Sequence, residues 1–125
     1  MKALISSDKV PVPAGPYSPG VTVGEWIFLA DQGGFDPTTG KVVSADLAEQ
    51  TEQTFTNIET LLQAAGASLD DVVSCLVHLV DLADFPTFNA VYAQKFTGTK
   101  PVRTTVRADL VAGLLVEITV VAHAS

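Results

Sequence analysis

The residues from 46 to 66 constrain the fold most, because they predict an amphipathic helix with both ends marked. Asp46 is a typical N-cap, and Glu49 stands three residues later, as in a capping box. Apolar residues keep helical spacing at Leu47, Phe55, Ile58, Leu61, Leu62 and Ala65. Gly66 suits the C′ position that ends many helices.

Strand-like runs lie on both sides of this helix. Two short strands are predicted at 21–23 and 26–30, around a turn at Gly24-Glu25, and a longer one at 72–80. A second amphipathic helix is predicted to begin near Asp84 and to end near Gly98. It is marked by Phe85, Phe88, Val91, Tyr92 and Phe96. The runs at 101–106 and 114–122 are the last two predicted strands.

A helix between two strand regions requires a crossover connection, so part of the sheet is expected to be parallel. The resulting prediction is an α+β fold, with a mixed β-sheet and two helices on one face. Two helices cannot cover both faces of the sheet. Because 47% of residues are hydrophobic and only 17% are charged, we expect another subunit to cover the open face.

Composition excludes several classes of function. The chain of 125 residues is long enough for one domain, which we place at 1–125. A net charge of −7 without a Lys/Arg cluster argues against a nucleic-acid partner. Cys75 is the only cysteine, and no metal-ligand spacing is visible, so we expect neither metal nor cofactor. We see no signal peptide or membrane span and expect a cytoplasmic protein.

Arg103 and Glu117 are the candidate chemical pair, because each interrupts an apolar strand-like run. A charge in such a run is costly unless it is exposed, paired or used. Arginine offers a fork of donors that matches a carboxylate, and glutamate can orient or deprotonate a water molecule. The pair therefore suggests a pocket for a small anion. A structural ion pair, or two residues on a solvated sheet face, would explain the same pattern.

Three other residues admit functional interpretations. His78 lies on the opposite face of its run from Val77 and Leu79, and a structural or interface role is favoured over catalysis. Cys75 has no basic neighbour in sequence to lower its pKa, so we interpret it as a small buried residue. Tyr17 lies in a Pro/Gly-rich loop, where its phenol could close over a ligand or simply anchor the loop.

The whole chain resembles the Rid family (RidA, also called YjgF), the reactive-intermediate deaminases. The motifs that carry this resemblance are Ala14-Gly15-Pro16-Tyr17-Ser18, Phe28-Leu29-Ala30-Asp31-Gln32, Asp36-Pro37-Thr38-Thr39-Gly40, Gln50-Thr51 to Asn57-Ile58, Leu69 to Val73, Asp84-Phe85 to Tyr92, Pro101 to Val106 and Val116-Glu117-Ile118. Each motif is weak alone, but their order and spacing extend over about 110 residues.

This resemblance implies a chorismate-mutase-like fold, a homotrimer with clefts between subunits, and a small-molecule substrate. It also implies cofactor-free hydrolysis of enamines and imines, such as 2-aminoacrylate, to a 2-oxo acid and ammonia. Arg103 would bind the substrate carboxylate and Glu117 would position the water. Tyr17 would act with them, and the cleft would be lined by Ala30, Asp31, Gln32, Asn89 and Thr105.

The chain departs from the family pattern at Ala30-Asp31, where active members usually have Ser-Gly. An aspartate that faces the cleft would repel a carboxylate substrate. Two alternatives therefore stand beside the deaminase. One is a divergent enzyme of the same fold that uses Asp31 on a different, possibly biosynthetic, substrate. The other is a non-catalytic trimer that binds small ligands or acts like a chaperone.

Overall fold

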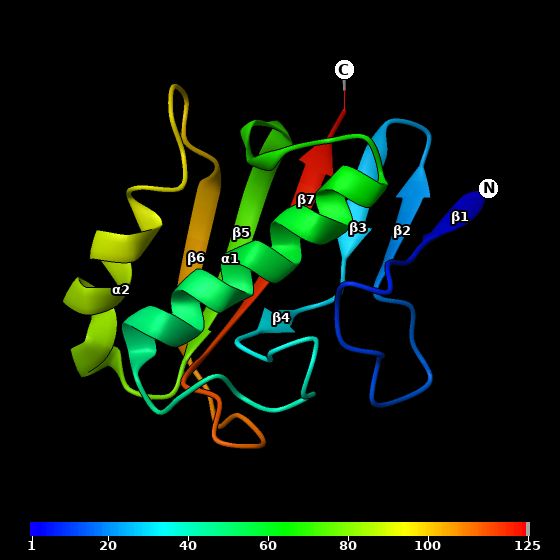
Figure 1. Cartoon of the computed structure of the whole chain (residues 1–125). Helices are drawn as coiled ribbons and strands as arrows, with labels where there is room; N and C mark the ends of the chain where they lie inside the picture. The colour runs from blue at the N-terminus through cyan, green and yellow to red at the C-terminus, as the bar shows by residue number, and fades with distance from the viewer. Residues whose placement is uncertain (125) are drawn as a thin grey trace.

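The computed structural model describes residues 1–124, which form one seven-stranded mixed sheet with two α-helices against one face (Figure 1). The elements are β1 (Lys2–Ile5), β2 (Gly20–Val23), β3 (Trp26–Leu29), β4 (Gln32–Gly33), α1 (Leu47–Ala64), β5 (Val72–Leu79), α2 (Phe85–Tyr92), β6 (Val102–Arg107) and β7 (Val116–His123). The predicted α+β class with a mixed sheet is confirmed.

The strand order is β1-β2-β3-β7-β5-β6, and the short β4 pairs with β7 where β3 has left it. Strands β5 and β6 are parallel, as the helical connection between them requires, and the other pairs are antiparallel. Figure 1 shows α1 crossing the middle of the sheet and α2 lying beside β6 at one edge.

Helix α1 has the predicted ends. The carboxylate of Asp46 accepts a hydrogen bond of 2.9 Å from the backbone N–H of Glu49. Gly66 has a φ of 79°, which is the left-handed conformation expected just beyond a helix. Its apolar side buries Phe55, Ile58 and Leu61 completely against the strands. Each such side chain contributes about 1.5–3 kcal/mol by leaving water.

Two predicted element bounds were wrong, and two strands were missed. Helix α2 ends at Tyr92 rather than near Gly98. Beyond it the chain turns more tightly, because the N–H groups of Gln94 and Lys95 donate to carbonyls only three residues back. Phe96 is buried without being helical. Strand β7 starts at Val116, two residues later than its apolar run. Strands β1 and β4 were not predicted, since one is a short edge strand and the other is only two residues long.

The second face of the sheet carries no helix and exposes large apolar side chains. Cross-strand register places Trp26 and Phe28 of β3, Leu76 of β5 and Val106 of β6 on this open face. They remain between 37% and 45% exposed, although they lie in the middle of strands. An apolar area of this kind typically marks an interaction surface. His78 lies on the same face, opposite to Val77 and Leu79 as predicted.

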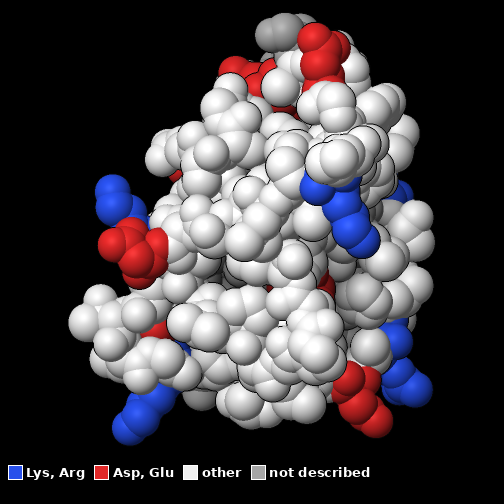
Figure 2. Space-filling model, turned by 90° about the vertical axis from the view of Figure 1, so that its right-hand side faces the viewer, with Lys and Arg blue, Asp and Glu red and all other residues white. Residues whose placement is uncertain are grey.

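Charges are dispersed on the side of the molecule that carries β1. There, a few Lys, Arg, Asp and Glu side chains of both signs are scattered over a largely uncharged surface (Figure 2). No helix within residues 1–124 is long and apolar enough to cross a membrane.

Gly34 is needed for the close approach of the chain to α1. A Cβ at this position would lie 2.9 Å from both the Cα and the carbonyl oxygen of Gln50, closer than real Cβ contacts allow. We therefore expect Gly34→Ala to lower the free energy of unfolding by about 1–3 kcal/mol, measured by urea denaturation. Gly15→Ala is the control, because its Cβ would lie 3.5 Å from the Tyr17 ring, an ordinary contact. Equal stability of both variants would show that α1 can move away from Gly34.

Candidate functional site

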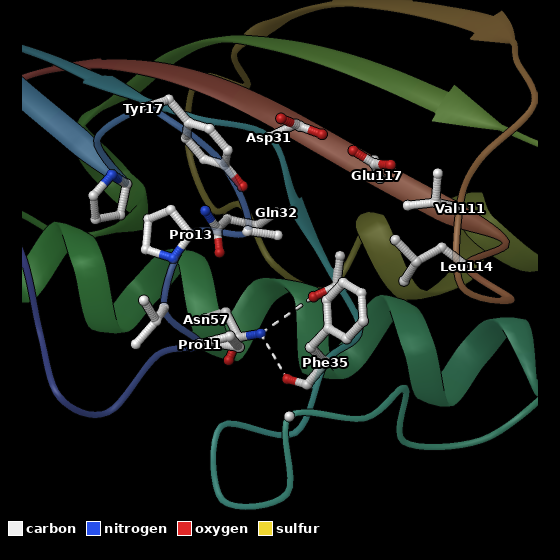
Figure 3. Close-up of a pocket in the computed structure, with 15 residues that line it drawn as sticks. Pro11, Pro13, Tyr17, Asp31, Gln32, Phe35, Asn57, Val111, Leu114 and Glu117 are labelled. Carbon is white, nitrogen blue, oxygen red and sulfur yellow. Dashed lines mark hydrogen bonds between the residues drawn. The ribbon is translucent and has the colours of Figure 1, made fainter.

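One group of candidate residues lines a cavity beside β4 and β7. The cavity has a volume of about 240 Å³, and its lining includes Tyr17, Asp31, Gln32 and Glu117 (Figure 3). Tyr17 comes from the Pro/Gly-rich loop, Gln32 from β4 and Glu117 from β7. Asp31 belongs to the segment that leads from β3 into β4. Four of the expected site residues therefore lie around one cavity, and Ala30 directly precedes one of them in sequence.

The loop that carries Tyr17 is tied to the end of β3. The backbone N–H of Ala30 donates a hydrogen bond of 2.9 Å to the carbonyl oxygen of Pro19. Within the loop, the N–H of Tyr17 donates to the carbonyl of Gly15, also at 2.9 Å. These bonds hold the phenol over the cavity, where it is 54% exposed and free to meet a ligand.

The charged groups in the cavity lining are both carboxylates. Figure 3 shows the carboxylates of Asp31 and Glu117 beside each other along β7, with Tyr17 on the far side of Asp31. Asp31 is exposed and Glu117 is half-buried. No Lys or Arg of the described chain lines this cavity. By itself, this half of the site would attract a hydrogen-bond donor or a cation rather than an anion.

Asp31 does not need the conformational freedom of a glycine. Among the described non-glycine residues, only Ala112 has a positive φ. The backbone at Asp31 is therefore accessible to any residue, and an aspartate can stand there without strain.

Two buried amide side chains of α1 hold this cavity in shape. Asn57 donates hydrogen bonds to the carbonyls of Gly33 and Phe35, at 3.2 and 2.9 Å. Gln50 accepts from the N–H of Leu115 at 2.8 Å and donates to the carbonyl of Gly113 at 3.2 Å. The first amide fixes β4, and the second fixes the approach to β7.

Our sequence interpretation missed these two amides as functional positions. The signal was present, because Gln50 and Asn57 lie seven residues apart, on the side of the helix that carries Leu47 and Leu61. Amides on an apolar helix face must find partners inside the protein. The apolar cavity lining was also missed, and it includes Pro11, Pro13, Phe35, Val111 and Leu114.

A second group of candidate residues lies at the other edge of the sheet. Arg103 of β6 points toward α2, where its Nη1 donates a hydrogen bond of 2.9 Å to Oδ1 of Asn89. Thr105 follows on the same face of β6, and its buried hydroxyl has no hydrogen-bond partner within residues 1–124. Asn89, Arg103 and Thr105 thus form one cluster.

The expected pocket between Arg103 and Glu117 does not exist within one chain. Arg103 pairs in register with Cys75 of β5, whereas Glu117 pairs with His78 of the same strand. Residues 75 and 78 point to opposite faces of β5, so Arg103 and Glu117 also lie on opposite faces. The structure shows no ion pair between them either, since the ion pairs among the described residues are Lys95–Glu52 and His123–Glu25.

Behind Arg103, Cys75 and Tyr92 are buried and remain uncharged. Burial raises the pKa of the Cys75 thiol, and the neighbouring Tyr92 hydroxyl and the charge of Arg103 only partly oppose this. Burial also raises the pKa of the Tyr92 phenol. Neither group is an activated nucleophile or base. Cys75 is 1% exposed, as expected for a small buried residue.

Comparison with known proteins gives the family. The model of the family described as "Endoribonuclease L-PSP" matches residues 7–124. A RutC family protein of Saccharolobus solfataricus is 44% identical over the full length of both chains. A protein of Bos taurus named 2-iminobutanoate/2-iminopropanoate deaminase is 40% identical, over 98% of this chain and 90% of its own. This chain belongs to the Rid family.

Solved Rid structures have the same fold. The crystal structure of RidA from an Antarctic Psychrobacter species superposes with a TM-score of 0.93 at 38% identity, covering 97% of this chain and 98% of that one. The 1.2 Å structure of the YjgF gene product from E. coli superposes with a TM-score of 0.91 at 35% identity, with coverage of 97% and 98%. The resemblance inferred from the sequence is confirmed, and this Rid chain has the family's arrangement of strands and helices.

Proposed function

We propose that this protein hydrolyses reactive 2-enamine and 2-imino acids, of the 2-aminoacrylate type, to a 2-oxo acid and ammonia. One observation carries the proposal: the chain has a carboxylate-lined cavity on one side and, on the other, an arginine that forms no ion pair with any residue of 1–124. Relatives named as a reactive intermediate deaminase and as 2-iminobutanoate/2-iminopropanoate deaminases support the reaction class.

The two half-sites need a second copy of the chain to meet. We propose a homotrimer in which the open sheet faces are covered and the β6–α2 edge of one subunit reaches the β4–β7 cavity of the next. The exposed Trp26, Phe28, Leu76 and Val106 support this assembly, since they would leave water on association. Arg103 of one copy would then face Glu117 of its neighbour.

The reaction can be written with the side chains of the two half-sites. The enamine first tautomerises to the imine, whose carbon is electrophilic when the nitrogen is protonated. Arg103 holds the substrate carboxylate while water adds to this carbon and gives a proton to Glu117. The proton returns to the nitrogen, the C–N bond breaks, and the hydroxyl proton leaves with ammonia as ammonium. In this proposed reaction, Tyr17 donates a hydrogen bond to the reacting groups.

A ribonuclease function is less compatible with this chain, although the family model carries that description. With 7 basic against 14 acidic residues, the protein would repel the RNA backbone.

Removing Arg103 or Glu117 tests the reaction. With 2-aminoacrylate generated in situ, we expect Arg103→Ala to lower kcat/KM about 10–100-fold, chiefly through KM, because a charge-assisted hydrogen bond is lost. Glu117→Gln should lower kcat about 100-fold or more, because the proton acceptor is lost. Ammonia release is the measurement. Arg107→Ala, on an exposed arginine of the same strand, is the matched control.

Full activity of Arg103→Ala in an intact assembly would refute the proposed role. Unfolding or dissociation of that variant would instead show that Arg103 is structural. If the wild type binds small ligands but never releases ammonia, the protein is a ligand-binding trimer without catalysis.

The proposed homotrimer can be tested separately from the reaction. We expect light scattering to give three times the chain mass of 13.1 kDa at micromolar concentration. Leu76→Arg should shift this mass toward the monomer, because it places a charge in the covered face. Thr56→Arg adds the same charge on the exposed side of α1 and should leave the trimer intact. A monomeric wild type would contradict the proposal.

A second candidate function is favoured by the paired carboxylates of the cavity. Asp31 and Glu117 line one wall, so a substrate with a positively charged side chain would bind better there than one with two carboxylates. Like charges about 5 Å apart at an effective dielectric of about 20 repel by roughly 3 kcal/mol. In this case the protein acts on a different substrate from 2-aminoacrylate, and Asp31 selects it.

Asp31→Asn separates the two candidates, because it removes the charge and keeps the shape. Amino-acid oxidases can supply imino acids with cationic, neutral and anionic side chains. If Asp31 faces the substrate, the wild type should prefer the cationic imino acid, and the variant should lose that preference by up to about a hundredfold. Glu59→Gln, outside the cavity lining, is the control. An unchanged ranking would mean that Asp31 faces away and that the ordinary deaminase function stands.

A further inference from the structure

The guanidinium of Arg103 is surrounded by aromatic rings of α2. Its Cζ lies 4.7 Å from the ring centre of Tyr92, 5.2 Å from that of Phe85 and 5.7 Å from that of Phe88. These distances are within the range of cation–π attraction. The rings stabilise the positive charge without neutralising it, as a carboxylate partner would do.

This arrangement leaves most donors of Arg103 free. A guanidinium has five N–H groups, and the structure assigns one of them to a partner, Asn89. No Asp or Glu among residues 1–124 forms an ion pair with Arg103. A ring that covers the face of the guanidinium leaves its edge open, and the edge is where the fork of donors points.

Of the three rings, Tyr92 lies nearest the guanidinium and packs against the most other rings. It is only 6% exposed and packs against Phe88 and Phe96, with ring centres 5.5 and 5.0 Å away. Phe55 of α1 contacts it at 5.9 Å, so the ring is anchored to both helices. Its hydroxyl, by contrast, is buried without a hydrogen-bond partner of normal geometry in the described chain. The structural role therefore rests on the ring rather than on the hydroxyl.

We infer that Tyr92 is a positioning residue that fixes the plane of the Arg103 guanidinium and aims its free N–H edge at an incoming carboxylate. This inference rests on the proposed function, in which Arg103 binds the substrate carboxylate. The affinity of Arg103 for the carboxylate then depends on the aromatic face of α2. Tyr92 itself need not touch the substrate.

Three variants test the inference. Tyr92→Leu removes the ring, Tyr92→Phe removes only the hydroxyl, and Phe96→Leu removes an equally buried ring of the same cluster, for which no contact with Arg103 is found. We expect Tyr92→Leu to raise KM, and the Kd for 2-oxobutanoate measured by calorimetry, about tenfold with little change in kcat. Tyr92→Phe and Phe96→Leu should retain the wild-type KM and Kd.

Two results would overturn the inference. If Phe96→Leu weakens binding as much as Tyr92→Leu, the ring acts only through general stability. If Tyr92→Phe weakens binding as much as Tyr92→Leu, the hydroxyl acts and the ring does not.

A readout that needs no substrate separates this inference from the proposed function. The NMR resonance of the Arg103 Nε–H should be shifted by the Tyr92 ring current and should move in Tyr92→Leu but not in Phe96→Leu. If these shifts appear while the wild type shows neither turnover nor carboxylate binding, Tyr92 positions Arg103 but the proposed function fails. If turnover is normal and the resonance is the same in both variants, the proposed function stands and the inference fails.

Discussion

The hydrogen bonds of Gln50 and Asn57 are the constraint on which the cavity half of the site depends. Both amides are almost completely buried in α1, and both bind backbone groups of segments that are distant in sequence. Leaving such a buried group unpaired costs about 1–3 kcal/mol, so the segments cannot leave α1 without a penalty. Gly34 makes this possible, because its missing side chain lets the chain reach the helix backbone.

The best-predicted parts of the fold were those specified by local chemistry. Asp46 and Gly66 marked α1 at both ends because caps depend on a few neighbouring atoms. Strand β5 followed from an apolar run, and the expectation that part of the sheet is parallel is met by its pairing with β6. Strand β4 could not be predicted, because two residues carry no periodicity and their pairing with β7 depends on α1.

The site was predicted as a set of residues but not as an arrangement. Tyr17, Asp31, Gln32 and Glu117 do line one cavity, while Arg103, Asn89 and Thr105 form a separate cluster. The separation of Arg103 from Glu117 comes from register, which decides the face of each side chain and cannot be read from either strand alone. The aromatic surroundings of Arg103 were also hidden, because the sequence predicted those rings only as the apolar side of a helix.

The electrostatics of the two half-sites argue for a functional link between assembly and chemistry. Among the residues that the structure describes, the cavity lining has two carboxylates and no Lys or Arg, and Arg103 lies beside aromatic rings without an acidic partner. Each half is thus electrostatically incomplete, and in the cleft that we propose each would supply what the other lacks. Two carboxylates against one guanidinium still leave an excess of negative charge. With a glycine in place of Asp31, the charges of Arg103 and Glu117 would balance each other before the substrate enters. With Asp31, one net negative charge remains, and it is balanced only by a substrate whose positive charges exceed its carboxylate by one, such as a protonated imino acid with a cationic side chain. In the cleft that we propose, the residue at position 31 would therefore decide which side chains are accepted, while Arg103 and Glu117 would serve the part that all 2-imino acids share.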